Sequence, residues 1–180
     1  APFLDFIGVR ALVITDIDTT KAVVSDKTGK TSYLACPVAE SSHTSNETLK
    51  HFLSAPDPKE EKDFSDWHKR LVDGTASSGE GQIVVAYQLA EDGYHARSFE
   101  DAFISINLDK VKARKDTLAG LKNRDALDQF GGDDIYYLTA QILGKKSDFA
   151  GSVLYLALVE SESWRVPKYI MDGLKWIHKN

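Results

Sequence analysis

The chain of 180 residues is poor in cysteine, and this excludes two classes of protein. Cys36 is the single cysteine, so the sequence contains neither an internal disulfide framework nor a zinc cluster built from cysteines. The five histidines include no pair with H-x-x-x-H spacing, so we expect each to be a surface or partly buried residue rather than a zinc ligand. Such cysteine usage fits a reducing, cytoplasmic location.

Long hydrophobic runs and an excess of positive charge are also missing. No apolar run is long enough to span a bilayer, so we expect no membrane partner. The formal net charge of −5 does not favour a nonspecific polyanion binder. The hydrophobic content of 42% is enough for a core, and the length predicts one domain or a domain with an insertion.

The most informative feature that is present is Asp16-Ile17-Asp18, directly after the apolar run 11–14. A short β-rich run that ends on two carboxylates is typical of acidic ligands at the carboxyl edge of a sheet. Asp16 and Asp18 share one face of a continuing strand, or converge on one cation from a turn beyond it. Hard divalent ions such as Mg²⁺ take such oxygen ligands. A surface turn with two solvated aspartates is the alternative.

Two metal-dependent families use this motif in this context. D-I-D-T-T fits the D-x-D-x-T nucleophile motif of haloacid-dehalogenase-type phosphatases, in which Asp16 would attack phosphorus and Asp18 would be the acid and base. It equally resembles the D-x-D strand end of Toprim domains, the metal-binding fold of topoisomerases, primases and some nucleases. In that family both aspartates would bind a divalent metal ion.

Strands and helices are expected to alternate along the chain. Apolar runs predict strands at 11–15 and 83–87, and amphipathic spacing predicts a helix at 59–72. The smaller elements expected are a polar segment at 19–32 with a turn at 26–30, a short strand at 33–36, and a helix after a capping box at 44–47. After Ser98 the chain is expected to be mostly helical, with a break at 131–132.

The first eight residues are typical of the last turns of a helix that stops at Gly8. A helix that leads straight into a strand is typical of the middle of a βαβ unit. We therefore expect the chain to be a fragment of a longer protein whose preceding strand is absent. A mature secreted protein that begins at Ala1 is the competing interpretation.

Two further segments carry candidate residues. In the first, Ser98 is a natural N-cap and Asp101 completes a capping box. Glu100 lies in the first turn of the following helix, where the helix dipole favours a negative charge. The start of a helix is therefore a sufficient explanation for these three residues. In the second, Lys145 and Lys146 stand at a helix start, where cations are unfavourable but where amides and lysines together suit a phosphate. The alternative for the second segment is a solvated lysine pair.

The order D-I-D, H-T-S-N-E-T-L-K-H-F-L, A-R-S-F-E-D-A-F-I and K-K-S-D-F-A resembles the carboxyl-terminal Toprim region of OLD-family (overcoming lysogenization defect) endonucleases. The resemblance runs from about Leu12 to about Leu156, and R-S-F-E-D-A-F and K-x-D-F-A are its most specific parts. It implies an α/β fold: a Toprim, Rossmann-like parallel sheet flanked by helices, with an additional helical subdomain. Residues 1–107 would form the catalytic core with a helical insertion at about 44–72, and residues 108–180 a mostly helical part that completes the core.

The same resemblance implies a hydrolase that cuts DNA with two Mg²⁺ or Mn²⁺ ions, and it assigns roles to residues. Asp16 and Asp18 would be metal ligands, and Glu100 with Ser98 would serve a second metal position. Lys146 would be catalytic and would stabilise the charged transition state. An amino-terminal ABC-type ATPase in the parent protein would be the partner through which ATP acts, and a homodimer is a further expected partner.

One departure from the family pattern affects activity. Toprim domains carry a glutamate motif on the strand before the D-x-D strand, and no such segment precedes Asp16, so we expect the chain alone to be a poor nuclease. No Walker A pattern is present. Two alternatives stay open: a haloacid-dehalogenase-type phosphatase, for which 132–134 would supply acids, and a non-catalytic dimerisation or DNA-docking module.

Overall fold

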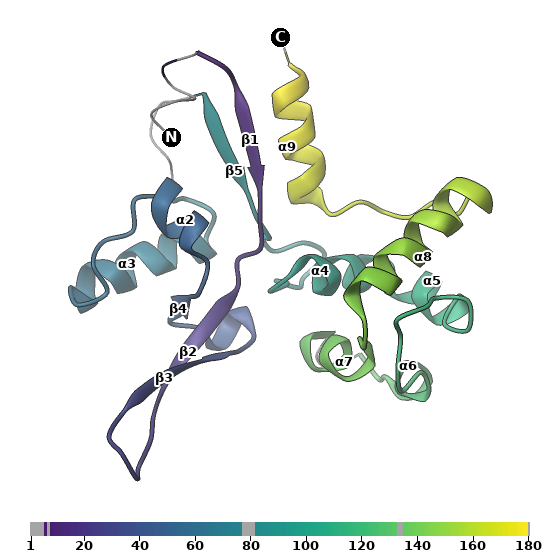
Figure 1. Ribbon diagram of the computed structural model, residues 1–180, viewed down its shortest axis with the longest axis horizontal. Helices are drawn as coiled ribbons and strands as arrows, with labels where there is room; N and C mark the ends of the chain where they lie inside the picture. Colours follow the sequence, from purple (N-terminus) through teal and green to yellow (C-terminus); the bar gives the residue numbers. More distant parts are fainter. Residues whose placement is uncertain (1–5, 7, 77–81, 133–134, 180) are drawn as a thin grey trace. The chain divides into compact units, whose positions relative to one another are not determined.

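The computed structural model describes residues 6, 8–76, 82–132 and 135–179. The chain divides into two compact units, residues 1–98 with 168–180 and residues 99–167, and each unit is described by itself (Figure 1). Strands occur in the first unit and helices in both. The expected α/β class is confirmed.

A two-stranded parallel sheet forms the centre of the first unit. Strand β1 (Ala11–Ile14) pairs with β5 (Ile83–Ala86) in parallel, with Ala11 opposite Ile83. Helix α9 (Lys168–His178) packs on both strands, as Figure 1 shows. A Cβ atom at Gly173 would lie 2.9 Å from Leu12 Cδ1, so glycine is what lets the helix approach the sheet this closely. Both strands lie where the apolar runs predicted them.

An antiparallel sheet follows the parallel one. Its strand order is β3-β2-β4, formed by β2 (Thr19–Val24), β3 (Thr31–Ala35) and β4 (His43–Thr44), and the short 3-10 helix η1 (Val38–Glu40) lies between β3 and β4. The hairpin turn spans Ser25 to Lys30, as expected, and Ser25 N donates to Lys30 O over 2.9 Å. The first half of the polar segment expected at 19–32 is instead strand β2. Its Thr and Val residues have a high β propensity, and it pairs with β3 and with β4.

Two helices cover the aromatic core of this unit. Helix α3 (Glu61–Val72) buries Phe64, Trp67 and Leu71 as its spacing predicted. Helix α2 (Glu47–Phe52) begins at an N-cap formed by Asn46, whose side chain accepts from Leu49 N over 3.1 Å. The capping box expected to start at Thr44 is therefore wrong. Thr44 belongs to β4, and its hydroxyl donates to Ile17 O over 2.6 Å.

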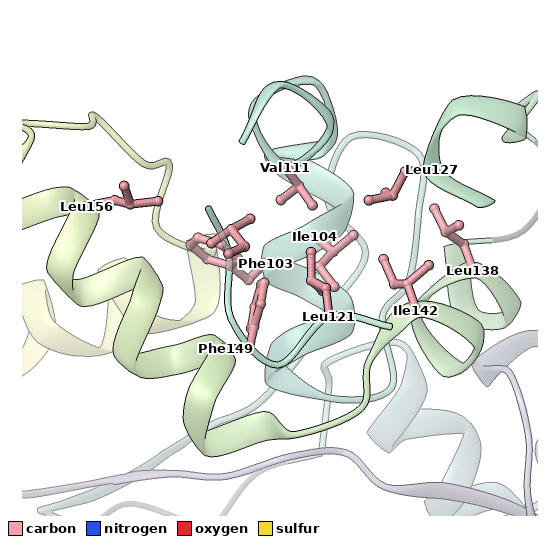
Figure 2. Close-up of a cluster of buried hydrophobic side chains, with 10 residues drawn as sticks. Phe103, Ile104, Val111, Leu121, Leu127, Leu138, Ile142, Phe149 and Leu156 are labelled. Atoms are coloured by element: carbon pink, nitrogen blue, oxygen red, sulfur yellow. The ribbon is translucent and has the colours of Figure 1, made fainter. Parts of the chain in front are cut away.

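Helices are the main regular elements of the second unit, as expected after Ser98. It contains α4 (Phe99–Ile106), α5 (Leu108–Ala113), α6 (Asp125–Gln129), α7 (Ile135–Ile142) and α8 (Lys146–Val159). Figure 2 shows Phe103, Ile104 and Phe149 meeting in its hydrophobic core. The two core phenylalanines touch edge to face, with ring centroids 6.1 Å apart. In the part of the chain that the structure describes, no helix combines the length and apolarity needed to cross a membrane.

Candidate functional site

Asp16 and Asp18 lie on a short turn at the carboxyl end of β1. Thr15 N donates to Ala86 O over 3.0 Å, so the parallel pairing ends one residue before Asp16. Between the two aspartates, Ile17 is fully buried and anchors the turn in the core. Asp18 has φ = 46°, a left-handed conformation that aspartate tolerates better than most residues. Both carboxylates are half-buried, so the turn exposes its acids at the sheet edge that the sequence predicted.

Gln88, just beyond β5, is buried and forms hydrogen bonds to this turn. Its side chain is 1% exposed, and its Oε1 accepts from Ile17 N over 2.7 Å. Because a backbone N–H only donates, this bond fixes the orientation of the amide, and Nε2 faces the other way. Nε2 donates to Asp16 Oδ1 over 2.6 Å and to the hydroxyl of Tyr169 over 3.0 Å. A neutral donor therefore orients the Asp16 carboxylate without neutralising its charge.

Asn46 holds the same turn from the side of α2. Its Nδ2 donates to Asp16 O over 2.6 Å and to the Thr15 hydroxyl over 2.7 Å, while its Oδ1 caps the helix. The start of α2 and the acidic turn are thus fixed by one side chain. Loss of Asn46 removes a helix cap and a turn anchor together.

Asp18 has a cationic neighbour instead of an amide. Arg97 Nη2 lies 3.3 Å from Asp18 Oδ1, and Arg97 O accepts from Asp18 N over 3.2 Å. The Arg97 Nε also donates to Thr19 O over 2.9 Å. The Asp18 side chain remains 36% exposed, so the ion pair compensates its charge while leaving the carboxylate open to solvent.

His95 supports the segment that carries Gln88. Its Nε2 lies 3.0 Å from Gln88 O, and because a carbonyl only accepts, Nε2 is the donor. Burial lowers the pKa of His95 below its ordinary value of 6.5, and the bond to Gln88 opposes that shift in part. The neutral ring is the form that the folded state favours.

The remaining predicted site residues lie around the start of α4 and α8. Ser98 is buried and is the last residue of the first unit before α4. Glu100 and Lys146, both in the second unit, form an ion pair with 2.8 Å between Oε2 and Nζ. The Glu100 side chain is 13% exposed and that of Lys146 is 62% exposed. The structure therefore joins two residues that are 46 positions apart and to which the family resemblance gives roles in one reaction.

A tight junction fixes where α8 starts. Gly120 O accepts from Gly144 N and Lys145 N, over 2.8 and 3.0 Å. Gly120 has φ = 78°, and a Cβ atom there would lie 2.3 Å from Lys145 O, so only glycine fits. The adjacent Lys145 side chain is 79% exposed and lies 3.8 Å from Asp148, not beside Glu100. The two lysines thus have different environments.

The donor chemistry of the acidic turn fits a hard divalent cation in type. Asp16 and Asp18 offer carboxylate oxygens, and one Asp16 oxygen already has a neutral donor. Among the described residues no group of three or more His, Cys, Asp or Glu side chains is arranged to hold a metal ion. The two aspartates would hold an ion only with ligands from elsewhere, such as water or substrate phosphate.

Sequence reasoning missed the residues that position the turn. Gln88, Asn46 and Arg97 are polar side chains whose partners in the turn lie 30 to 79 positions away in the chain. A signal existed for Gln88 alone, since it is a polar residue directly after a strand predicted to be parallel to β1. The acids proposed for the phosphatase alternative, Asp133 and Asp134, lie outside the described residues.

Comparison with known proteins relates the chain to an endonuclease. It is 30% identical over 193 residues to endonuclease GajA of Bacillus cereus (strain HuB5-5). The alignment covers 98% of this chain, which spans about a quarter of the length of that curated relative. Neither a protein-family model nor a solved structure matches the chain significantly.

Proposed function

We propose that this chain is the nuclease portion of a divalent-metal-dependent DNA endonuclease of the OLD type, with a Toprim core. One observation carries the proposal: two carboxylates, Asp16 and Asp18, stand at the carboxyl end of a parallel strand, and a buried neutral amide orients the first of them. Similarity to an endonuclease over almost the whole chain supports it.

Asp16 and Asp18 would hold Mg²⁺ or Mn²⁺, and Glu100 with Ser98 would serve a second metal position. Bound metal ions would supply an activated water and support for the leaving oxygen of the phosphodiester.

Each protein group has a defined task in this scheme. Gln88 orients Asp16 and preserves its negative charge for the cation. Arg97 compensates the charge of Asp18 in the structure, and a bound cation would supply that compensation instead. Lys146 places a fixed positive charge where negative charge grows on the phosphate, because an ammonium group does not ligate a metal ion.

The parent protein would add an amino-terminal ABC-type ATPase, through which ATP acts, and a homodimer would bring two such sites together. These partners follow from the resemblance to the OLD family. The proposal on the chain itself is independent of them.

The test is DNA cleavage by the full-length protein in Mg²⁺, Mn²⁺ and EDTA, with calorimetric titration of the same ions. We expect cutting in either ion, none in EDTA, and saturable binding that Asp16→Asn weakens. A protein that binds neither ion would point to the dimerisation or DNA-docking module instead. Hydrolysis of small phosphate monoesters without DNA cleavage would favour the phosphatase.

A further inference from the structure

A small pocket in the first unit lies beside the acidic turn and has no role in the scheme above. Its volume is about 250 Å³, below the roughly 300–1,000 Å³ typical of pockets for drug-sized ligands. Strands β2, β3 and β4, the segment after β4, and helices α2 and α3 contribute the residues that matter here: Thr20, Tyr33, His43, Ser45, Lys50 and Phe64. Its size suits one planar ring system.

Aromatic rings form one wall of the pocket. The Tyr33 and His43 ring centroids are 4.7 Å apart, and His43 stacks on Phe64 at 5.0 Å. Phe64 is buried, whereas Tyr33 is 53% exposed, so the stack runs from the core out to solvent. Burial, and then the nearby Lys50, lowers the pKa of His43, which favours the neutral ring. The wall therefore presents flat, uncharged surfaces.

Thr20 offers the pocket a hydroxyl group that no protein group bonds to. Its residue is 4% exposed and lines the pocket, yet its hydroxyl makes no hydrogen bond within the described part of the chain. The neighbouring Thr19 hydroxyl, by contrast, donates to Cys36 O over 2.8 Å. Among the described residues the only buried side-chain nitrogen or oxygen without a partner is Arg124 Nε, so solvent reaches the Thr20 hydroxyl oxygen, and this oxygen is available to a ligand with a polar edge.

The charge in the pocket is balanced. Lys50 forms an ion pair with Glu47 over 2.8 Å, and both residues line the cavity. A neutral ring with hydrogen-bonding groups on its edge matches this lining better than a phosphate does. Nucleobases have this chemistry, and their stacking on aromatic side chains is a general mode of binding unpaired strands.

The pocket adjoins the turn that would carry the reaction. Ser45 lines the pocket, and its backbone N–H donates to Asp18 O over 3.0 Å. A strand whose phosphate lies at Asp16 and Asp18 would thus have a neighbouring base within reach of the pocket.

We propose that this pocket, with Tyr33 as stacking surface and the Thr20 hydroxyl as polar contact, binds one unpaired base of a DNA strand at the acidic turn. The inference rests on the proposed function for its substrate, and it adds that the substrate is unpaired next to the cut.

Binding of a fluorescently labelled ten-nucleotide deoxythymidine strand tests this in the full-length protein with EDTA present, so that no cleavage is needed. Tyr33→Leu should weaken binding about 5- to 150-fold, the range of one lost base stack. Thr20→Val should weaken it about 2- to 12-fold, the range of one hydrogen bond, without lowering the melting temperature.

Matched substitutions separate binding from folding. Thr19→Val removes a hydroxyl that is already bonded, so it should lower the melting temperature and leave affinity unchanged. Tyr155→Leu removes a similarly exposed tyrosine, 55% accessible, from the second unit and should also leave affinity unchanged. If folded Thr20→Val binds like wild type, or if Tyr33→Leu costs no more than Tyr155→Leu, the pocket is not a base site.

Two further measurements distinguish this proposal from the alternatives and from the proposed function. Free thymidine 5′-monophosphate that binds as tightly as the strand would overturn a strand site in favour of a nucleotide site. Metal-dependent cleavage that survives both pocket substitutions unchanged would overturn the pocket and keep the proposed function. Strand binding that depends on Thr20 and Tyr33 in a protein that never cleaves would keep the pocket and overturn the nuclease.

Discussion

Gln88 and Asp16 are joined by a hydrogen bond of 2.6 Å between a buried neutral amide and a half-buried carboxylate. The pair is 72 positions apart in the chain. The same amide accepts from Ile17 N, so the turn can move only if both bonds break. An arginine in place of Gln88 would also orient Asp16, but it would cancel the charge that a cation needs.

Gln88→Met should therefore weaken Mn²⁺ binding by about 10- to 100-fold, the usual loss when a residue that orients a metal ligand is removed. It also leaves the Ile17 N–H buried without an acceptor, which costs about 1–3 kcal/mol of stability. Calorimetric titration and thermal melting in EDTA measure the two effects.

Tyr169→Phe is the control for this prediction. It removes only the hydroxyl that shares Nε2 with Asp16, so ion affinity should stay near wild type. If Gln88→Met and Tyr169→Phe bind Mn²⁺ equally well, the amide does not position Asp16 for a cation.

Asp16→Asn should abolish metal-dependent DNA cleavage by the full-length protein while the fold is kept. Asparagine can still accept from Gln88, so the turn keeps its hydrogen bond and loses only the charge. Cleavage at saturating Mg²⁺ or Mn²⁺ measures activity, and circular dichroism measures folding. Asp63→Asn, on an exposed position of α3, should cut normally. Near-normal cutting by folded Asp16→Asn would remove Asp16 from the metal ligands.

Lys146→Ala should reduce turnover far more than ion affinity. Only the lysine end of the Glu100 pair is exposed, so the substitution leaves a mostly buried carboxylate without this donor and should lower the melting temperature modestly. A side chain that acts only in the transition state lowers kcat and kcat/KM together. Steady-state cleavage kinetics give both constants.

Lys145→Ala is the internal control, because Lys145 is adjacent, equally charged and directed at Asp148. Its kcat should fall much less than the kcat of Lys146→Ala. Equal losses at the two lysines would leave only a general basic patch at the start of α8.

Stability should fall as the pH drops below about 6.5, because His95 is buried and its folded pKa lies below the ordinary value of 6.5. In that window the unfolded state binds more protons than the folded state, so unfolding takes up protons and becomes easier in acid. His68, whose pKa burial also lowers, adds to the same slope. His95→Gln keeps a donor for Gln88 O and removes one titrating group, so its melting temperature should change less between pH 7 and pH 5. An unchanged slope in this variant would contradict the assignment.

Much of the first unit follows from local patterns. The apolar runs gave β1 and β5 to within one residue, and the spacing of Phe64, Trp67 and Leu71 gave α3 and its buried face. The polar composition of residues 19–32 predicts the turn but not strand β2, because pairing with β3 and β4 on its two sides, and not a hydrophobic pattern of its own, makes this segment a strand. The local pattern predicts Thr44 as an N-cap, but Thr44 pairs with Thr19 in the sheet and Asn46 caps the helix instead.

The sequence by itself determined that two carboxylates end a strand, that a lysine pair starts a helix, and that the chain resembles a nuclease family. Only the tertiary structure decided which neighbours these groups have: an amide for Asp16, a guanidinium for Asp18, a carboxylate for Lys146. The physical reason is the separation in sequence over which each effect acts. Propensity and periodicity arise from residues a few positions apart, whereas contacts across 46 to 79 positions form only when packing closes long loops and must satisfy every buried polar group at once.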